Sequence, residues 1–563
     1  MNLGDKTVYQ IYVRSFFDSD GDGVGDLAGI TAKLDYLAWL GVDYLWLNPF
    51  FPSPQNDNGY DVSDYCAVDP RFGTMADFER LCQCAAEKGI GIMLDMVFNH
   101  SSTEHEWFQK ALSGDAAHRE YYFFVPAKPD GGPPSNWASK FGGSAWEKVP
   151  SGEYYLHRFD KTQADLNWAS PQVREALYDV LRFWTKKGAR GFRFDMVNLI
   201  SKPDTFEADE RGDGRCFYTD GPAVPERLRA MRRVIQDAMG ETPFLTVGEM
   251  SSTSPEKCGV YSNPETGGLS MAFHFHHLKT DYPDGEKWRK GALDFPLLKK
   301  TLHTWQTSME ENGGWDALFW NNHDQPRALT RFASSKPAYR YHSATMLAAV
   351  IHFMRGTPYI YMGEEIGMIN PAFDRIDDYR DVETLNYYRI LRECGMSEAE
   401  VMAIVRARSR DNSRTPMQWT ADARGFTTGT PWIKAAASGA AINVEAEREK
   451  PDGILAFYQR LITLRKTLPV IQTGHYQPVL EDCAPLFAYR RTYQGDTLVS
   501  IHNFFEEPFV LPAARLPLDG CVGLPALLAS NYPALREPEP DFSRDLVLQP
   551  YETLTVLFRA DGR

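Results

Sequence analysis

Short runs of apolar and β-branched residues alternate along much of the chain with stretches in which apolar positions recur at helical spacing. Eight such runs follow one another, namely TVYQIYV, DYLWLNPF, GIGIMLDMVF, GARGFRFDMV, PFLTVGEM, LSMAFHFH, DALFWNNHD and TPYIYMGEE. Helical stretches such as MADFERLCQCAAEKG and SPQVREALYDVLRFWTKKG separate them, and each ends in the glycine preferred after a helix. Because strands alternating with helices build parallel sheets, the pattern predicts an α/β fold, a (β/α)8 TIM barrel.

Two regions depart from this alternation. Residues 101–167 are rich in Gly, Pro, Trp and Tyr and are too long for an ordinary barrel connection, so we expect an inserted subdomain B after the third strand. From residue 475 onward, short β-like runs are separated by turns, which predicts a C-terminal antiparallel β-sandwich domain over 475–563. The catalytic barrel would then comprise residues 1–100 and 168–474.

Composition and charge narrow the setting of the protein. No apolar run approaches the roughly 20 residues of a membrane helix, and the start MNLGDKTVYQIYVRSFF lacks the features of a secretory signal. The eight cysteines form no CxxC pair, which argues against zinc and against a disulfide framework. The net charge of -15 disfavours nucleic acids and anionic membranes as partners, so an anionic ligand would need a local basic patch. We expect a cytoplasmic enzyme, a monomer with a small-molecule substrate.

The stretch DSDGDGVGD carries a carboxylate at every second residue. Its spacing matches the first five ligand positions of an EF-hand loop, with oxygen donors from Asp18, Asp20, Asp22, the Val24 carbonyl and Asp26. The twelfth position holds a glycine, and the following LAGITAKLDYLAWLG reads as one amphipathic helix without a second hand. The loop therefore predicts either a single structural Ca²⁺ or Mg²⁺ or a solvated turn, and nothing in the sequence calls for an organic cofactor.

Carboxylates stand at the ends of several predicted strands, where barrel enzymes carry their active sites. The fourth, fifth and seventh strands end in GFRFD, VGE and NNHD, which deliver Asp195, Glu249 and Asp324. Three carboxylates at one barrel mouth suit glycoside hydrolysis by paired acids. Metal-dependent hydrolysis is the rival, but HFHH alternates faces as a strand does and no HExxH is present.

These segments carry a resemblance to a known family. DMVFNH, GFRFDMVN, VGEM and NNHDQPR resemble the four signature segments of glycoside hydrolase family 13, the α-amylase superfamily, and the resemblance covers nearly the whole chain. QIYVRSFFDSDGDGVGDLAGI, SPQNDNGYDVSDY and DNSRTPMQW are similar to the subgroup that acts on short α-glucosides, in which the DGDG loop is a structural calcium or magnesium site. The resemblance thus implies that the ion braces the fold and takes no part in the chemistry.

Further segments indicate one activity within the family. RCFYTDGP, VGEMSSTS and FHFHHLKTDYPDGEKW resemble the α,α-phosphotrehalases, which implies cleavage of trehalose 6-phosphate to glucose and glucose 6-phosphate. The alternative is an oligo-1,6-glucosidase or related α-glucosidase. Met196 departs from relatives that often carry Val directly after the nucleophile, so it bears on the leaving-group subsite. An inactive scaffold of the kind that assembles with transporters would have lost its carboxylates, which this chain keeps.

The resemblance also implies roles for individual residues. Asp195 would be the nucleophile of a retaining reaction, Glu249 the general acid and then base, and Asp324 a stabiliser of the sugar ring. Arg193 would hold Asp195 ionised, whereas Glu249 would need an apolar or anionic setting to keep its proton. The non-reducing glucose would be bound by residues scattered over several loops: Asp57, Tyr60, His100, Arg193, His323 and Arg414.

A phosphorylated substrate requires cationic donors in this acidic protein. The segment HHLKTDYPDGEKW supplies Lys279 and Lys287 just beyond the sixth strand, on the reacting face of the barrel. Lys202 and Arg215, beyond the nucleophile strand, are reserve candidates. The alternative for each is an ordinary solvated side chain.

Overall fold

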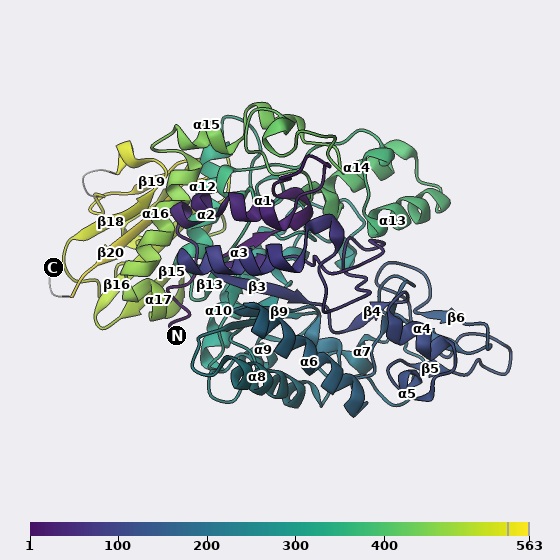
Figure 1. Cartoon of the computed structure of the whole chain (residues 1–563). Helices are drawn as coiled ribbons and strands as arrows, with labels where there is room; N and C mark the ends of the chain where they lie inside the picture. The colour runs from purple at the N-terminus through teal and green to yellow at the C-terminus, as the bar shows by residue number, and fades with distance from the viewer. Residues whose placement is uncertain (537–539, 561–563) are drawn as a thin grey trace.

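Eight parallel strands form the centre of the molecule in the computed structural model, which describes residues 1–536 and 540–560 (Figure 1). Their neighbour order is β11-β10-β9-β3-β2-β1-β13-β12. Each predicted run contains one of these strands, so the predicted fold class is confirmed. The strands are β1 (Val8–Ile11), β2 (Tyr44–Leu47), β3 (Gly91–Met96), β9 (Gly191–Phe194), β10 (Leu245–Met250), β11 (Met271–His274), β12 (Ala317–Leu318) and β13 (Thr357–Tyr361).

Two strand pairings, β1 with β13 and β11 with β12, complete the closed barrel. The first strand pairs in parallel with the second and the last, so that Tyr9 lies opposite both Leu45 and Ile360. At the other seam β12 has only two residues, and a single parallel bridge joins Ala272 to Asp316 just before it. The N–H of Ala272 also donates to the carbonyl of Trp315 (3.1 Å). The sheet is therefore closed, with its weakest pairing between β11 and β12.

The strands are buried on both faces because helices cover the outside of the barrel. Local signals set the helix ends: Thr74 and Asp77 form a capping box at the start of α3, and Gly188, with φ of 115°, ends α6. The single helix predicted after β1 is divided into two at Lys33. The covering helices are α1 (Leu27–Ala32), α2 (Leu34–Leu40), α3 (Met75–Glu87), α6 (Pro171–Lys187), α8 (Val224–Met239), α9 (Pro255–Tyr261), α10 (Phe295–Glu311), α12 (Arg340–Phe353) and α16 (Ile454–Thr467).

The connection from β3 to α6 folds into a small unit of its own on the right of Figure 1. Its strands form two small antiparallel sheets, β4 with β8 and β5-β7-β6. An aromatic cluster around Trp137 and Trp146 packs against Phe206 of the barrel loops. The elements are β4 (His100–Ser102), α4 (Glu106–Leu112), α5 (Ala116–Arg119), β5 (Phe124–Val125), β6 (Trp146–Lys148), β7 (Tyr154–Leu156) and β8 (Gln163–Asp165). The exact limits of subdomain B stay a prediction.

Further helices lie in the connections between these elements, and the chain ends in a separate antiparallel region, on the left of Figure 1. The loop helices are α7 (Arg215–Tyr218), α11 (Ala328–Phe332), α13 (Val382–Glu393), α14 (Glu398–Arg408), α15 (Val444–Arg448) and α17 (Pro469–Thr473). The C-terminal strands pair as β14-β15-β16-β20-β18 and β17-β19 around one apolar cluster. They are β14 (His475–Val479), β15 (Leu486–Tyr493), β16 (Asp496–Asn503), β17 (Phe509–Leu511), β18 (Pro525–Ser530), β19 (Leu546–Leu548) and β20 (Thr553–Phe558). Residues 537–539 and 561–563 of the predicted C-terminal domain lie outside the described residues.

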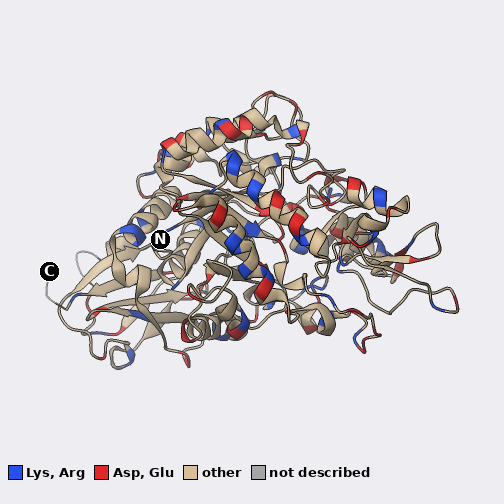
Figure 2. Cartoon of the chain, turned by 60° about the horizontal axis from the view of Figure 1, so that its bottom comes forward, with Lys and Arg blue, Asp and Glu red and all other residues tan. Residues whose placement is uncertain are grey.

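Basic and acidic side chains are interleaved along the helices seen in Figure 2. In the described part of the chain, none of the helices combines the length and the apolar character needed to cross a membrane. The eight cysteines are all free thiols.

Candidate active site

The three predicted catalytic carboxylates lie together at the carboxyl ends of the barrel strands. Asp195 directly follows β9, Glu249 is the penultimate residue of β10, and Asp324 follows β12 in the NNHD segment. All three line one cavity of about 220 Å³. Its other lining residues are Asp57, Tyr60, His100, Lys140, Phe141, Phe159, Met196, Phe275, Lys287, Gln325, Glu383 and Arg410.

The guanidinium of Arg193 is the charge that connects the first two carboxylates. Its Nη1 donates to Asp195 Oδ1 (2.8 Å) and also pairs with the buried Asp95, while its Nη2 contacts Glu249 Oε2. Since a single guanidinium reaches both, the carboxyl groups of Asp195 and Glu249 are neighbours. Arg193 thus faces Asp195 as expected, but Glu249 meets a cation where the sequence led us to expect an apolar or anionic setting.

Asp324 is held by three groups of positive or potentially positive charge. Arg414 Nη2 donates to its Oδ1 at 2.8 Å, Arg410 Nη1 lies at 3.3 Å, and His323 Nε2 lies 3.2 Å from Oδ2. Burial alone would raise the pKa of Asp324, but the charges of His323, Arg410 and Arg414 lower it below its ordinary value. Asp324 is therefore a fixed anion on the wall of the cavity.

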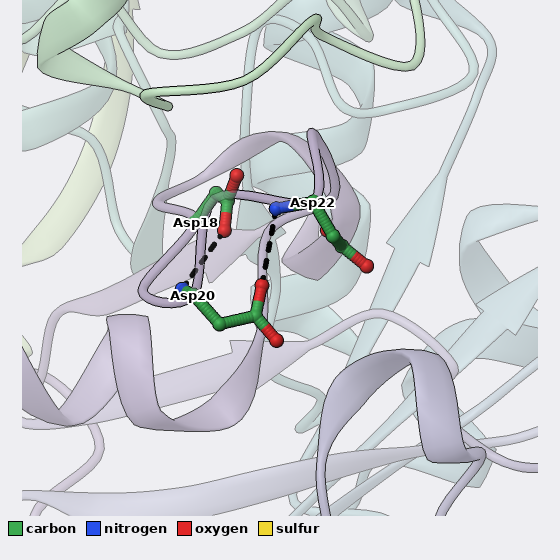
Figure 3. A group of neighbouring side chains, drawn as sticks. All are labelled: Asp18, Asp20 and Asp22. Carbon is green, nitrogen blue, oxygen red and sulfur yellow. Dashed lines mark hydrogen bonds between the residues drawn. The ribbon is translucent and has the colours of Figure 1, made fainter.

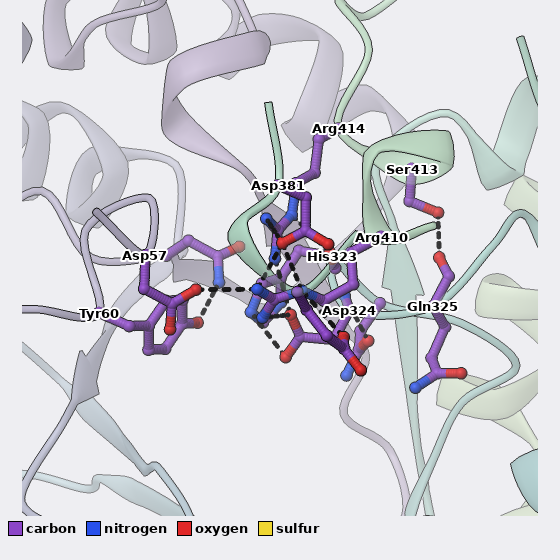
Figure 4. Close-up of polar contacts among 12 residues, drawn as sticks. Asp57, Tyr60, His323, Asp324, Gln325, Asp381, Arg410, Ser413 and Arg414 are labelled. Atoms are coloured by element: carbon purple, nitrogen blue, oxygen red, sulfur yellow. Dashed lines mark hydrogen bonds and ion pairs between the residues drawn. The ribbon is translucent and has the colours of Figure 1, made fainter. Parts of the chain in front are cut away.

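Asp57 lies on the other side of Arg410 from Asp324, as Figure 4 shows. Arg410 Nη2 donates to Asp57 Oδ1 (2.9 Å), and Gln163 Nε2 donates to the other oxygen (3.1 Å). Burial raises the pKa of Asp57 to about 7 despite the opposing charges of Arg410 and Arg414. Arg410 is further fixed by Asp381, which accepts from its Nε (2.8 Å).

Tyr60 and His100 complete the wall of the cavity, and His323 lies behind Tyr60. The ring of Tyr60 stacks on His323, with centroids 5.2 Å apart and planes 3° from parallel, and its hydroxyl donates to Asp95 Oδ2 (2.8 Å). His100 lies with Nε2 3.1 Å from the Tyr60 carbonyl. Of the residues predicted to hold glucose, Asp57, Tyr60 and His100 line the cavity directly. Arg193, His323 and Arg414 stand behind it and orient the carboxylates.

Several residues of the site were not predicted from the sequence. Arg410 lies within ion-pair distance of four carboxylates, although it stands immediately before the DNSRTPMQW segment that drew attention to Arg414. The sequence did contain a signal for Arg410, because this residue lies only four positions before Arg414. Asp381 lies at the N-cap of α13, where its other oxygen accepts from the Thr384 N–H (3.0 Å), and its sequence context resembles an ordinary cap.

A second, larger cavity of about 590 Å³ adjoins the first and shares Lys140, Lys287 and Glu383 with it. Cations outnumber carboxylates on its walls, with six against three. The cations are Lys140, Arg158, Arg215, Lys279, Lys287 and Arg289, and the carboxylates are Asp213, Glu286 and Glu383. This basic cavity is the local positive patch that the acidic chain was expected to need for an anionic ligand.

The candidate phosphate residues differ in how far their charges are neutralised. Lys279 lines the basic cavity, and no described residue forms an ion pair or side-chain hydrogen bond with its ammonium group. Burial, and then the charge of Arg215, lower the pKa of Lys279. By contrast Lys287 Nζ lies 2.6 Å from Glu383 Oε2.

The two reserve candidates are both paired. Lys202 forms a fully buried ion pair with Asp165 (2.9 Å) and lines neither cavity. Arg215 lines the basic cavity but pairs with Asp213 (2.9 Å).

The acidic loop after β1 brings three of its predicted donors together (Figure 3). Carboxylate oxygens of Asp18, Asp20 and Asp22 lie within 4.8 Å of one another. The Asp26 carboxylate instead accepts from the Gly29 N–H (2.6 Å) and so caps α1. Burial, and then the charges of Asp20, Asp18 and Asp26, raise the pKa of Asp22, although a hydrogen bond from the backbone of Val24 opposes them. A cation fits such a concentration of hard oxygen donors.

A family model described as the α-amylase catalytic domain matches residues 10–474. The chain therefore belongs to the α-amylase family and is a glycoside hydrolase, as its signature segments indicated. It is 51% identical to the trehalose-6-phosphate hydrolase of Bacillus subtilis (strain 168) over 515 residues, which cover 91% of each chain. It is also 44% identical to the oligo-1,6-glucosidase of Parageobacillus thermoglucosidasius, over 99% of this chain and 98% of the other. The crystal structure of the Bacillus licheniformis trehalose-6-phosphate hydrolase matches with a TM-score of 0.92 and 48% identity, over 99% of this chain and 100% of the other.

Proposed function

We propose that this glycoside hydrolase cleaves trehalose 6-phosphate to glucose and glucose 6-phosphate with retention of configuration. The observation that carries the proposal is the basic cavity, which adjoins the catalytic cavity and includes two lysines, Lys140 and Lys279, that form no ion pair with any carboxylate of the described residues. A phosphate dianion bound there would accept charge-assisted hydrogen bonds from groups such as Lys279, and several positive charges around it would compensate for its loss of water. The 51% identity to a trehalose-6-phosphate hydrolase supports the same substrate.

In the proposed mechanism Asp195 attacks the anomeric carbon and Glu249 protonates the departing oxygen. The bond from carbon to the leaving sugar breaks as the bond to Asp195 Oδ forms, which gives a covalent β-glucosyl enzyme. Glu249, now ionised, then takes a proton from water, and this water releases α-glucose from Asp195. The contact of Arg193 with both carboxylates supports their nearness, and Asp324, fixed by Arg414, would hydrogen-bond the sugar hydroxyls.

A second candidate activity is hydrolysis of unphosphorylated α-glucosides, favoured by the 44% identity to an oligo-1,6-glucosidase over nearly the full length. The deciding experiment measures glucose release side by side from trehalose 6-phosphate, trehalose, isomaltose and sucrose. We expect kcat/KM to be highest on trehalose 6-phosphate. A preference for isomaltose would assign the enzyme to the second activity.

Retention has its own test. Proton NMR early in the reaction identifies the anomer of glucose that forms first, before mutarotation mixes the two. We expect α-glucose. Early β-glucose would mean inversion, and Asp195 would then not be the nucleophile.

We further propose that Asp18, Asp20 and Asp22 hold one structural Ca²⁺ or Mg²⁺, with the Val24 carbonyl as a further donor and Asp26 as a cap beside it. The loop is tied to the segment after residue 425, since the Asp18 N–H donates to the Phe426 carbonyl (3.0 Å) and the Trp432 N–H to Gly23 (3.0 Å). An ion there would brace β1 against this segment, away from the cavity with the catalytic carboxylates.

Chelation tests the metal proposal. EDTA should lower the thermal midpoint by several degrees, because a bound ion stabilises the folded state by mass action, and added Ca²⁺ or Mg²⁺ should restore it. Protein that is still folded should keep its turnover. Loss of turnover without loss of fold, reversed by metal, would contradict a purely structural role.

The enzyme is proposed to be cytoplasmic, because a charged sugar phosphate does not diffuse through a lipid bilayer. It is further proposed to be a monomer. Cell fractionation and light scattering coupled to size exclusion test these two points. Activity in the secreted fraction, or a mass of twice the chain's 63.9 kDa, would contradict them.

A further inference from the structure

The two cavities meet at a neck formed by the three residues that line both, Lys140, Lys287 and Glu383. Lys287 and Glu383 form an ion pair there (2.6 Å), and Glu383 also accepts from the indole N–H of Trp288 (3.1 Å). Arg410 adds a second cation 3.5 Å from the same carboxylate. The charge of Lys287 is thus already neutralised within the protein.

Lys140 has no such partner in the part of the chain that the structure describes. It comes from subdomain B, between β5 and β6, and its Nζ donates there only to the hydroxyl of Ser251 (3.0 Å). Within the described residues no carboxylate lies within ion-pair distance of this ammonium, whose Nζ lies 5.2 Å from the centroid of the Phe159 ring. Burial, and then the charges of Arg158, Lys279 and Arg215, lower the pKa of Lys140 well below its ordinary value. An anion would relieve this electrostatic cost.

The contact with Ser251 ties Lys140 to the catalytic loops. Ser251 lies two residues after Glu249, and its N–H and carbonyl both bond the side-chain amide of Asn198, at 2.9 and 2.8 Å. Asn198 in turn lies three residues after Asp195. An anion held by Lys140 would therefore be in fixed register with both catalytic carboxylates.

We propose that Lys140 is a specificity-determining residue that contacts the phosphate of the leaving sugar at the neck between the two cavities. This inference rests on the proposed function and adds to it a residue from another part of the chain than Lys279. The phosphate oxygens accept from Nζ while Ser251 orients the ammonium. The anion thereby fixes the leaving sugar relative to Glu249, so the contact acts on kcat as well as on KM.

The test replaces the charge and keeps the length of the side chain. Lys140→Met should lower kcat/KM for trehalose 6-phosphate by roughly 10–150-fold, the range for losing one hydrogen bond to a charged group. On p-nitrophenyl α-glucoside, which has no phosphate, it should change less than about threefold, and Lys140→Arg should keep most of the activity on both. Lys148→Met, an exposed lysine of β6 in the same subdomain, is the matched control.

A second measurement reads binding directly. Glucose 6-phosphate should inhibit hydrolysis of the aryl glucoside by the wild-type enzyme, and Lys140→Met should weaken this inhibition about tenfold or more. Equal losses on both substrates, or unchanged inhibition, would overturn the assignment of Lys140.

The proposed function is tested separately by the wild-type enzyme on trehalose 6-phosphate. If that substrate is not cleaved, the function fails. Lys140 would then still stand as an anion contact only if its replacement relieves inhibition by glucose 6-phosphate, and it would fall if no such inhibition exists.

Discussion

The two neighbouring cavities differ in how far their charged side chains are paired with groups of opposite charge. In the catalytic cavity each aspartate faces an arginine, Asp195 through Arg193, Asp324 through Arg414 and Asp57 through Arg410. In the basic cavity neither Lys140 nor Lys279 forms an ion pair with a carboxylate of the described residues, although Asp213, Glu286 and Glu383 line the same cavity. The first arrangement holds groups in place for chemistry, and the second leaves charge to be neutralised by a ligand.

This difference predicts different consequences of mutation. Removing one partner of a buried ion pair leaves the other charge stranded and destabilises the protein, whereas removing an unpaired cation relieves repulsion. Replacements in the catalytic cavity should therefore affect turnover and stability, and those in the basic cavity should affect substrate choice alone.

The largest effect is expected for the catalytic carboxylates. Glu249→Gln should lower kcat by roughly 10²–10⁴-fold, because it removes the general acid and base, and Asp195→Asn should lower it at least as far. Steady-state kinetics on trehalose 6-phosphate measure both. Glu241→Gln, an exposed residue shortly before β10, is the control. A variant retaining more than about a tenth of wild-type kcat would remove that residue from its role.

Arg410 tests the paired side of the comparison. Arg410→Met leaves the buried carboxylates of Asp57 and Asp381 without their main partner and should cost about 3–5 kcal/mol of stability in addition to activity. Thermal and denaturant unfolding measure the loss. Arg389→Met, an exposed arginine of α13, should be nearly neutral. A fully stable Arg410→Met enzyme would show that the charges of this cavity do not depend on pairing.

Lys279 tests the unpaired side. Lys279→Met should lower kcat/KM for trehalose 6-phosphate by roughly 10–150-fold and leave an aryl α-glucoside nearly unaffected, because only the first substrate carries a phosphate. Stability should not fall. Lys287→Met should be less selective, because its ammonium already pairs with Glu383. Lys300→Met, exposed on α10, is the control, and equal losses on both substrates would exclude Lys279 from the phosphate site.

An effect on stability alone is expected away from both cavities, at Asp316 before β12. Burial raises the pKa of Asp316 to about 8, so this group contributes its full stability below about pH 4 and loses it as the pH rises through 8. The slope is at most about 1.4 kcal/mol per pH unit. Asp316→Asn keeps the hydrogen bond from Gln306 and removes the titration.

Denaturant unfolding of both proteins at pH 5 and pH 8 measures the Asp316 prediction. The variant should gain stability relative to the wild type as the pH rises. Parallel stabilities at the two values would mean that the carboxyl group titrates alike in the folded and unfolded chain.

The barrel could be predicted because its strands carry their own signal. A parallel strand covered by helices on one side and packed in the barrel on the other is apolar throughout, so runs such as GIGIMLDMVF stand out against amphipathic helices. The break at Lys33 between α1 and α2 could not be predicted in this way, because the apolar spacing continues across it. The two-residue length of β12 likewise reflects the geometry of closure and leaves no trace in DALFWNNHD.

The active site was predicted to the extent that its residues lie at strand ends. Asp195, Glu249 and Asp324 could be found because each lies at or near the end of a recognisable apolar run in the sequence. Lys140 could not, because it approaches the site from an irregular segment and meets Ser251, a residue 111 positions away, only through the packing of subdomain B on the barrel. The neutralisation of Lys287 could not be predicted either, because its partner Glu383 lies 96 residues further along the chain.

The pairing of β1 with β13 also sets a minimum delay before the barrel can close during synthesis. Ile360, the partner of Tyr9, is added 351 residues after it. At 5–20 residues per second this interval lasts roughly 20–70 s. During it, one edge of the first strand has no native partner, so the nascent chain must be kept from pairing with its neighbours on the ribosome until the barrel can close.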